Sequence, residues 1–138
     1  MESNEGGCLC KSIRYRVKGV PLSSIICHCV SCRKSSSAPS VAWLMFESEN
    51  LDILQGSPQS FESSTGVTRS FCAECGSALF YSSKDAIGTL DVTTISLDDD
   101  HLFPPTREVW LDHRVSWESK NDSLAQYPRG TNDGPYKS

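Results

Sequence analysis

The chain has 138 residues, the size of one domain, and 38% of them are hydrophobic, which is enough for one modest core. The formal net charge is −4 and the basic residues are scattered, which argues against a nucleic-acid binder with its basic face. No apolar run reaches the roughly 20 residues of a spanning helix. The N-terminal sequence MESNEGGCLC has no secretory signal pattern, so we expect a cytoplasmic protein that contacts neither nucleic acid nor membrane.

The predicted elements are almost all short β-strands. Residues 1–6 are polar and contain glycine, and we expect them to be loose. Residues 12–19 alternate apolar with basic side chains, which is the pattern of a half-buried strand. Further strands are predicted at residues 23–27, 41–46, 51–54, 59–63, 67–71, 77–81, 87–97 and 108–111. The apolar run at 41–46 is predicted to be buried on both faces.

Helix signals are scarce by comparison. Single helical turns are expected at residues 31–37 and 113–119, and from about residue 119 the chain is polar, with prolines and glycines. This composition predicts a tail that lies over the surface or frays. Short strands separated by turn residues predict a mainly β fold, an all-β sandwich or folded-over sheet, in a single domain over residues 1–138.

Seven cysteines carry the main functional signal, and an odd number in a cytoplasmic chain favours metal binding over a disulfide framework. They form three groups: the early pair (Cys8 and Cys10), the middle cluster (Cys27, Cys29 and Cys32) and the late pair (Cys72 and Cys75). The late pair has the spacing of a zinc knuckle, in which we expect Gly76 to let the backbone pass close behind the sulfurs.

Two divisions of the sulfurs satisfy tetrahedral zinc. In the first, the early and late pairs form a closed four-thiolate site, and the middle cluster holds a second zinc ion with an open fourth position. In the second, Cys29 and Cys32 join the late pair as a zinc ribbon, and the other three cysteines remain free thiols. We favour the first, because it explains every cysteine and separates a closed structural site from an open catalytic one.

The residues around the middle cluster allow alternatives. His28 lies between two proposed ligands, and we expect it to pack or hydrogen-bond behind them rather than bind metal. Arg33 and Lys34 are either solvated charges or groups that steady the thiolates and hold a substrate carboxylate. His28, Asp112 and His113 are the weak candidates for a general base.

Four segments, GGCLCKSIRY, CHCVSCRK, FCAECGSALFY and EVWLDHRVSW, occur in an order that resembles the glutathione-dependent formaldehyde-activating enzyme family, which includes the centromere protein V domain. The resemblance covers residues 6 to about 128. It implies a mostly β fold in which zinc staples a tent of sheets. Where many relatives have a histidine, this chain has Glu108, which puts the identity of the substrate in question.

The resemblance also implies ligands and a reaction. The early and late pairs match the family's structural zinc ligands, which are Cys8, Cys10, Cys72 and Cys75. The middle cluster matches its catalytic zinc ligands, which are Cys27, Cys29 and Cys32. The implied activity is that of a carbon–sulfur lyase acting on the adduct of a small thiol, glutathione in the family's reaction, with formaldehyde.

Two other classes of function compete with this interpretation. One is a non-enzymatic zinc-binding module in which both ions are structural and the surface serves protein contacts. The other is a redox protein that uses its Cys-x-x-Cys pairs. Metal content and sensitivity to chelators separate the three, because only the redox protein keeps its activity without metal.

Overall fold

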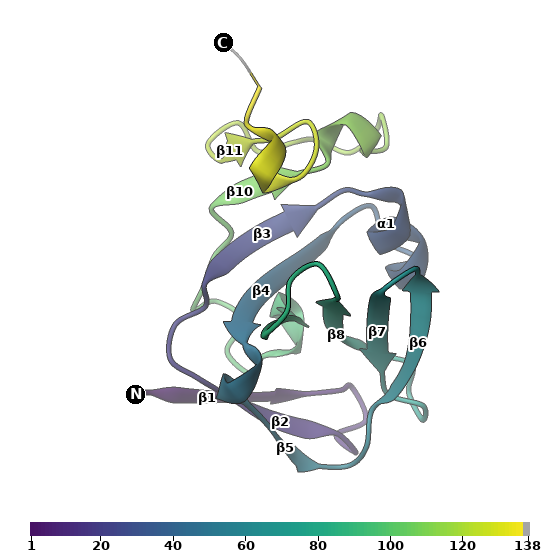
Figure 1. Cartoon of the computed structure of the whole chain (residues 1–138), viewed down its shortest axis with the longest axis vertical. Coiled ribbons are helices and arrows are strands. Elements are labelled where there is room, and N and C mark those ends of the chain that lie inside the picture. The colour runs from purple at the N-terminus through teal and green to yellow at the C-terminus, as the bar shows by residue number, and fades with distance from the viewer. Residues whose placement is uncertain (137–138) are drawn as a thin grey trace.

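The computed structural model describes residues 1–136 and has two β-sheets, one α-helix and several 3-10 turns (Figure 1). The smaller sheet is antiparallel with the order β1-β2-β5. Its strands are β1 (Ser3–Gly7), β2 (Arg14–Lys18) and β5 (Leu51–Gln55). The mainly β fold class expected from the sequence is confirmed.

The larger sheet has the order β11-β10-β3-β4-β9-β8-β7-β6. Its strands are β3 (Ser23–Cys27), β4 (Val41–Glu47), β6 (Gln59–Ser64), β7 (Val67–Phe71), β8 (Ala78–Ser83), β9 (Thr89–Thr93), β10 (Arg107–Val109) and β11 (Ala125–Gln126). Neighbours are antiparallel except around β10, which runs parallel to both β3 and β11. The helix α1 (Val30–Ser36) connects β3 to β4.

Strand β4, in the middle of the larger sheet, is buried on both faces. Leu44 and Phe46 point into a core shared with Tyr15 and Val17 of the smaller sheet. Because strand side chains alternate, Trp43 points to the opposite face, where it packs in a second core with the middle cluster of cysteines. The prediction of a strand buried on both faces is therefore confirmed for residues 41–46.

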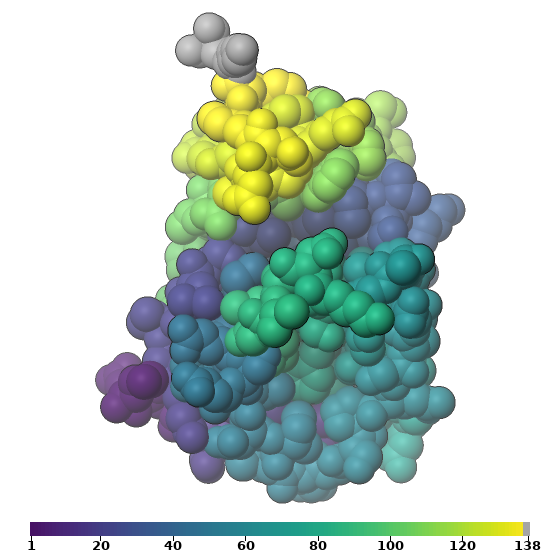
Figure 2. Space-filling model, viewed as in Figure 1, coloured from purple at the N-terminus to yellow at the C-terminus, as the bar shows by residue number. Residues whose placement is uncertain are grey.

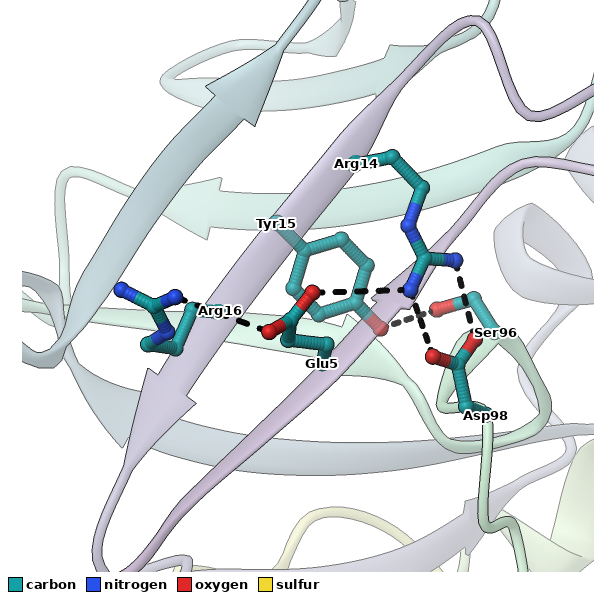
Figure 3. Close-up of polar contacts among 6 residues, drawn as sticks. All are labelled: Glu5, Arg14, Tyr15, Arg16, Ser96 and Asp98. Atoms are coloured by element: carbon teal, nitrogen blue, oxygen red, sulfur yellow. Dashed lines mark hydrogen bonds and ion pairs between the residues drawn. The ribbon is translucent and has the colours of Figure 1, made fainter.

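The prediction that residues 1–6 are loose is wrong, because β1 pairs along its length with β2. Gly6 permits this pairing: a Cβ atom there would lie 2.5 Å from the Tyr15 hydroxyl oxygen and 2.5 Å from the Ser96 carbonyl oxygen. The Tyr15 hydroxyl itself bonds the Ser96 hydroxyl across 2.6 Å (Figure 3). Sequence polarity did not reveal this strand, because its stability comes from main-chain pairing and not from apolar side chains.

Ion pairs also join side chains of β1 and β2 to each other and to Asp98. Arg14 donates to Asp98 at 2.9 and 2.5 Å and lies 3.8 Å from Glu5, while Arg16 lies 3.5 Å from Glu5 (Figure 3). These groups are partly exposed, so each pair contributes about 0–1 kcal/mol. Their arrangement nevertheless fixes the turn that carries Asp98 against β1 and β2.

The C-terminal segment packs at one end of the molecule, over β10 (Figure 2). The Tyr127 amide donates to the Glu108 carbonyl, and the Leu111 amide donates to the Tyr127 carbonyl, at 3.0 and 3.1 Å. Part of the segment that we expected to lie over the surface or fray is instead a strand, because Ala125–Gln126 pairs with β10 as β11; the last two residues lie outside the described part. Among residues 1–136 no helix is long and apolar enough to cross a membrane.

Candidate metal centres

The early and late pairs of cysteines meet between the two sheets. Their four sulfur atoms lie within 4.8 Å of one another. The early pair lies in the turn that follows β1, and the late pair lies in the turn between β7 and β8. Four cysteine sulfurs gathered in this way are a donor set suited to a tetrahedral soft or borderline metal ion such as zinc.

Two serine hydroxyls support these sulfurs. The Ser12 oxygen lies 3.1 Å from the Cys10 sulfur and 3.3 Å from the Cys72 sulfur. Hydrogen bonds from the Ser77 hydroxyl and the Ser77 backbone lower the pKa of the Cys75 thiol to about 5. A thiolate is the form that binds metal, so this environment prepares the group for coordination.

Gly76 has a different role from the one expected. A Cβ atom at this position would meet no atom within 4 Å, so close passage of the backbone is not its function. Its φ of +78° lies in the left-handed region, which glycine adopts without strain. In that conformation the Gly76 amide donates to the Cys72 carbonyl at 2.7 Å and closes the knuckle.

The middle cluster lies on the opposite face of the larger sheet, and its three sulfurs also lie within 4.8 Å of one another. Cys27 ends β3, and Cys29 is the N-cap of α1, where its sulfur accepts the Cys32 amide at 3.3 Å. With the Cys-x-x-Cys spacing, the first cysteine caps the N-terminus of the helix. The first turn of the helix then brings the Cys32 side chain back toward Cys29. The expected single turn at 31–37 is a seven-residue helix.

Arg69 of β7 is the charged partner of this cluster, although no pattern in the sequence singled it out. Its side chain is buried, and two of its guanidinium nitrogens lie 3.8 and 3.7 Å from the Cys32 sulfur. The guanidinium also lies over the Tyr81 ring, 5.1 Å from the ring centre. Hydrogen bonds from the Cys27 and Cys32 thiols, together with the Arg69 charge, hold the pKa of Cys29 well below its usual range.

The middle cluster opens into a cavity of about 200 Å³. Two polar side chains that reach it, Tyr81 and Asp91, are a cross-strand pair from adjacent strands and lie side by side on one face of the sheet. Trp43, Val109 and Trp110 supply apolar walls. Burial raises the pKa of Asp91 to about 7.

His28 is buried and turned toward Glu108, and it is not part of the sulfur cluster. Its Nε2 atom lies 2.9 Å from Oε1 of Glu108, whose other oxygen accepts the Asn121 amide at 2.7 Å. As expected from the sequence, His28 forms a hydrogen bond and does not join the group of sulfurs. Glu108 thus connects the middle cluster to the C-terminal segment.

The other polar residues singled out from the sequence do not line the 200 Å³ cavity. Arg33 and Lys34 line a separate pocket with Trp117, and Arg33 donates to the His28 carbonyl at 3.0 Å. Asp112 accepts a hydrogen bond from Tyr136, and His113 packs on Trp110 beside the cavity. The substrate-binding role of Arg33 and Lys34 stays a prediction.

Comparison with known proteins agrees with this architecture. The sequence profile described as glutathione-dependent formaldehyde-activating enzyme matches residues 3–113. The chain belongs to this family. The resemblance that the sequence analysis identified from four segments is therefore confirmed.

Individual relatives are more distant. The chain is 32% identical over 85 residues to an uncharacterized lyase of Schizosaccharomyces pombe, covering 59% of this chain and 58% of that protein. The fold also resembles the crystal structure of a Rhodobacter sphaeroides protein, with a TM-score of 0.60 and 18% identity. That match covers 73% of this chain and 97% of the other, and it bears on the fold alone.

Proposed function

We propose that the protein is a zinc-dependent carbon–sulfur lyase that makes or breaks the adduct of a small thiol with an aldehyde, such as S-hydroxymethylglutathione. The observation that carries the proposal is the cavity in which three cysteine sulfurs converge beside a buried arginine. Family membership and the name of the fission-yeast relative support the class of reaction. The substrate pair follows the description of the family.

The donor sets suggest different tasks for the two metal ions. The four sulfurs of the early and late pairs would fill all four coordination positions of one zinc ion. That ion would cross-link the turn after β1 to the turn between β7 and β8. The middle cluster supplies only three sulfurs and adjoins a cavity. Zinc bound there would keep one position for an outside ligand and would stabilise a substrate sulfur as thiolate.

Arg69 would balance the charge of the open site. Three thiolates and one divalent ion leave one negative charge in excess, and the neighbouring guanidinium compensates it. Trp43 and Trp110 line the cavity with apolar surface. A thiol and an aldehyde held together there react as a local pair, which replaces an encounter in solution.

The proposed reaction conserves atoms and electrons without a redox partner. In the cleavage direction, the hydroxyl group of the adduct loses its proton, the carbon–oxygen double bond forms, and the carbon–sulfur bond breaks with its electron pair on sulfur. In the synthetic direction, the thiol loses its proton, its sulfur attacks the carbonyl carbon, and the carbonyl oxygen takes up a proton, so no net proton is gained or lost.

A second cavity, of about 440 Å³, shares Trp43 and Arg69 with the first and has further aromatic walls from Phe61 and Phe80. It offers room for the part of the thiol that does not react. An apolar lining of this kind favours a substrate with hydrocarbon surface, so a panel of thiols should accompany glutathione in any assay.

The test is a measurement of metal content followed by substrate titration. We expect native mass spectrometry to find two zinc ions per chain, one of which is labile to chelators. Calorimetry should record faster heat release when glutathione and formaldehyde are added together with the protein than in their uncatalysed reaction, and no such turnover signal with either alone. Two equally inert zinc ions and no catalysis with any thiol would favour the alternative, a non-enzymatic zinc-binding module.

A further inference from the structure

We infer that Asp91 is a catalytic residue of this protein, the group that delivers a proton to the substrate oxygen during addition and removes it during cleavage. The inference rests on the proposed lyase function and deepens it by naming the general acid and base. Of the weak candidates from the sequence, His28 and Asp112 line neither pocket at the middle cluster, and His113 lines an adjacent pocket of about 300 Å³ with Cys29 but not the cavity that all three sulfurs line.

The register of the sheet places Asp91 in this cavity. Arg69 of β7 pairs with Tyr81 of β8, which in turn pairs with Asp91 of β9, so the three side chains lie in one row on one face. All three line the cavity together with the middle cluster. A substrate whose sulfur lies near the cysteines therefore lies within the same enclosed space as this carboxyl group.

The elements packed around Asp91 present few charges to it. β4 contributes Trp43, which does not titrate, and β8 contributes Tyr81. Arg69 on β7 is turned toward Cys32 and Ser35 and forms no ion pair with Asp91 within residues 1–136. The remaining titratable groups are the thiols from β3 and α1, namely Cys27, Cys29 and Cys32.

This environment gives the Asp91 carboxyl group a pKa close to neutral pH. Burial is the cause of its raised pKa of about 7, and no hydrogen bond or cation among the described residues offsets it. An acid with a pKa near the working pH serves as both donor and acceptor of a proton. Burial also raises the pKa of Tyr81 above its usual value, so this neighbour keeps its proton and does not act as the base.

Each direction of the reaction uses one form of Asp91. In addition, the sulfur–carbon bond forms, the carbonyl π electrons move to oxygen, and the protonated carboxyl group supplies the proton. In cleavage, the carboxylate removes the hydroxyl proton as the carbon–sulfur bond breaks. The overall reaction takes up and releases no net proton, so addition and cleavage share one pH profile, and that profile should change slope near pH 7, where Asp91 titrates.

The experiment compares the zinc-loaded wild type with Asp91→Asn and with the control Asp85→Asn, which changes an exposed aspartate between β8 and β9. Exchange spectroscopy by NMR measures the rate at which glutathione, formaldehyde and their adduct interconvert, between pH 5.5 and 8.5. We expect Asp91→Asn to lose about 100-fold in rate, to lose the inflexion near pH 7, and to keep two zinc ions. The control should match the wild type.

The outcomes separate this inference from the proposed function. If the wild type accelerates exchange and Asp91→Asn loses less than tenfold or keeps the inflexion, Asp91 is not the proton carrier and the lyase function stands. If the wild type accelerates exchange with no thiol in a panel, the lyase function fails and the inference fails with it. If Asp91→Asn does not fold, a wild-type pH profile without an inflexion near pH 7 overturns the inference.

Discussion

Replacing Asp91 by Asn should make the stability of the protein less dependent on pH. In the folded wild type, burial raises the pKa of this carboxyl group to about 7, whereas in the unfolded chain it titrates near its ordinary value of 3.8. Between these values the unfolded state loses its proton first, so ionisation favours unfolding. The wild type therefore loses stability as the pH rises from about 4 to about 7, and the loss levels off above pH 7.

The size of this change in unfolding free energy follows from the pKa shift of Asp91. Each pKa unit corresponds to 1.36 kcal/mol, so a rise from 3.8 to about 7 has an upper limit of about 4 kcal/mol. Asn is neutral at every pH and has nearly the same shape. The two proteins should be similarly stable near pH 4, and Asp91→Asn should be more stable by up to about 4 kcal/mol at pH 8.

Urea unfolding at a series of pH values measures this difference, with free zinc held at one concentration so that the metal contribution cancels between the two proteins. The cysteines are the same in both proteins, so their titration cancels as well. A difference in unfolding free energy that stays constant from pH 4 to pH 8 would refute the reasoning. It would mean that Asp91 titrates normally in the folded protein.

Three further predictions concern the metal centres and the core. Cys75→Ala should unfold the domain, whereas Cys29→Ala should remove one zinc ion and keep the fold, as measured by circular dichroism and metal content. Arg69→Met should lower the zinc affinity of the middle cluster about 10- to 100-fold, measured by competition with a chelator, because the guanidinium no longer compensates the thiolates. Leu44→Ala should destabilise the protein by about 2–5 kcal/mol in urea unfolding, because the side chain is fully buried.

Each of these predictions has an outcome that contradicts it. Equal unfolding of both cysteine variants would mean that both metal ions are structural. Unchanged zinc affinity in Arg69→Met would show that the arginine only fills space. For the core, Ile95→Ala is the control, since Ile95 is 70% exposed, and its effect should stay within about 0.5 kcal/mol. A similar cost at both positions would point to a loosely packed core.

Local sequence patterns were sufficient to predict most of the strands and the grouping of the cysteines. Alternation and short apolar runs located the strands from β2 to β10, although the strand predicted at 87–97 ends at Thr93 and the helical turn predicted at 113–119 lies instead at Leu111–His113. The spacing of the cysteines defined the groups that the fold gathers as four and three. Both signals are short in range: a strand is readable from its own side chains, and a knuckle from five consecutive residues. The family resemblance depended on the same segments.

Tertiary structure decided what surrounds the middle cluster. Alternation in residues 87–97 places Asp91 on the face opposite to Leu90 and Val92, but nothing in the sequence singled out Arg69 or revealed that this face is covered. It is covered because α1 and the C-terminal residues Trp110 and Tyr127 pack over it. The same long-range packing pairs β1 with β2 and brings His28 to Glu108. A charged side chain in a strand becomes part of a site only when a distant segment encloses it, and no local pattern records that enclosure.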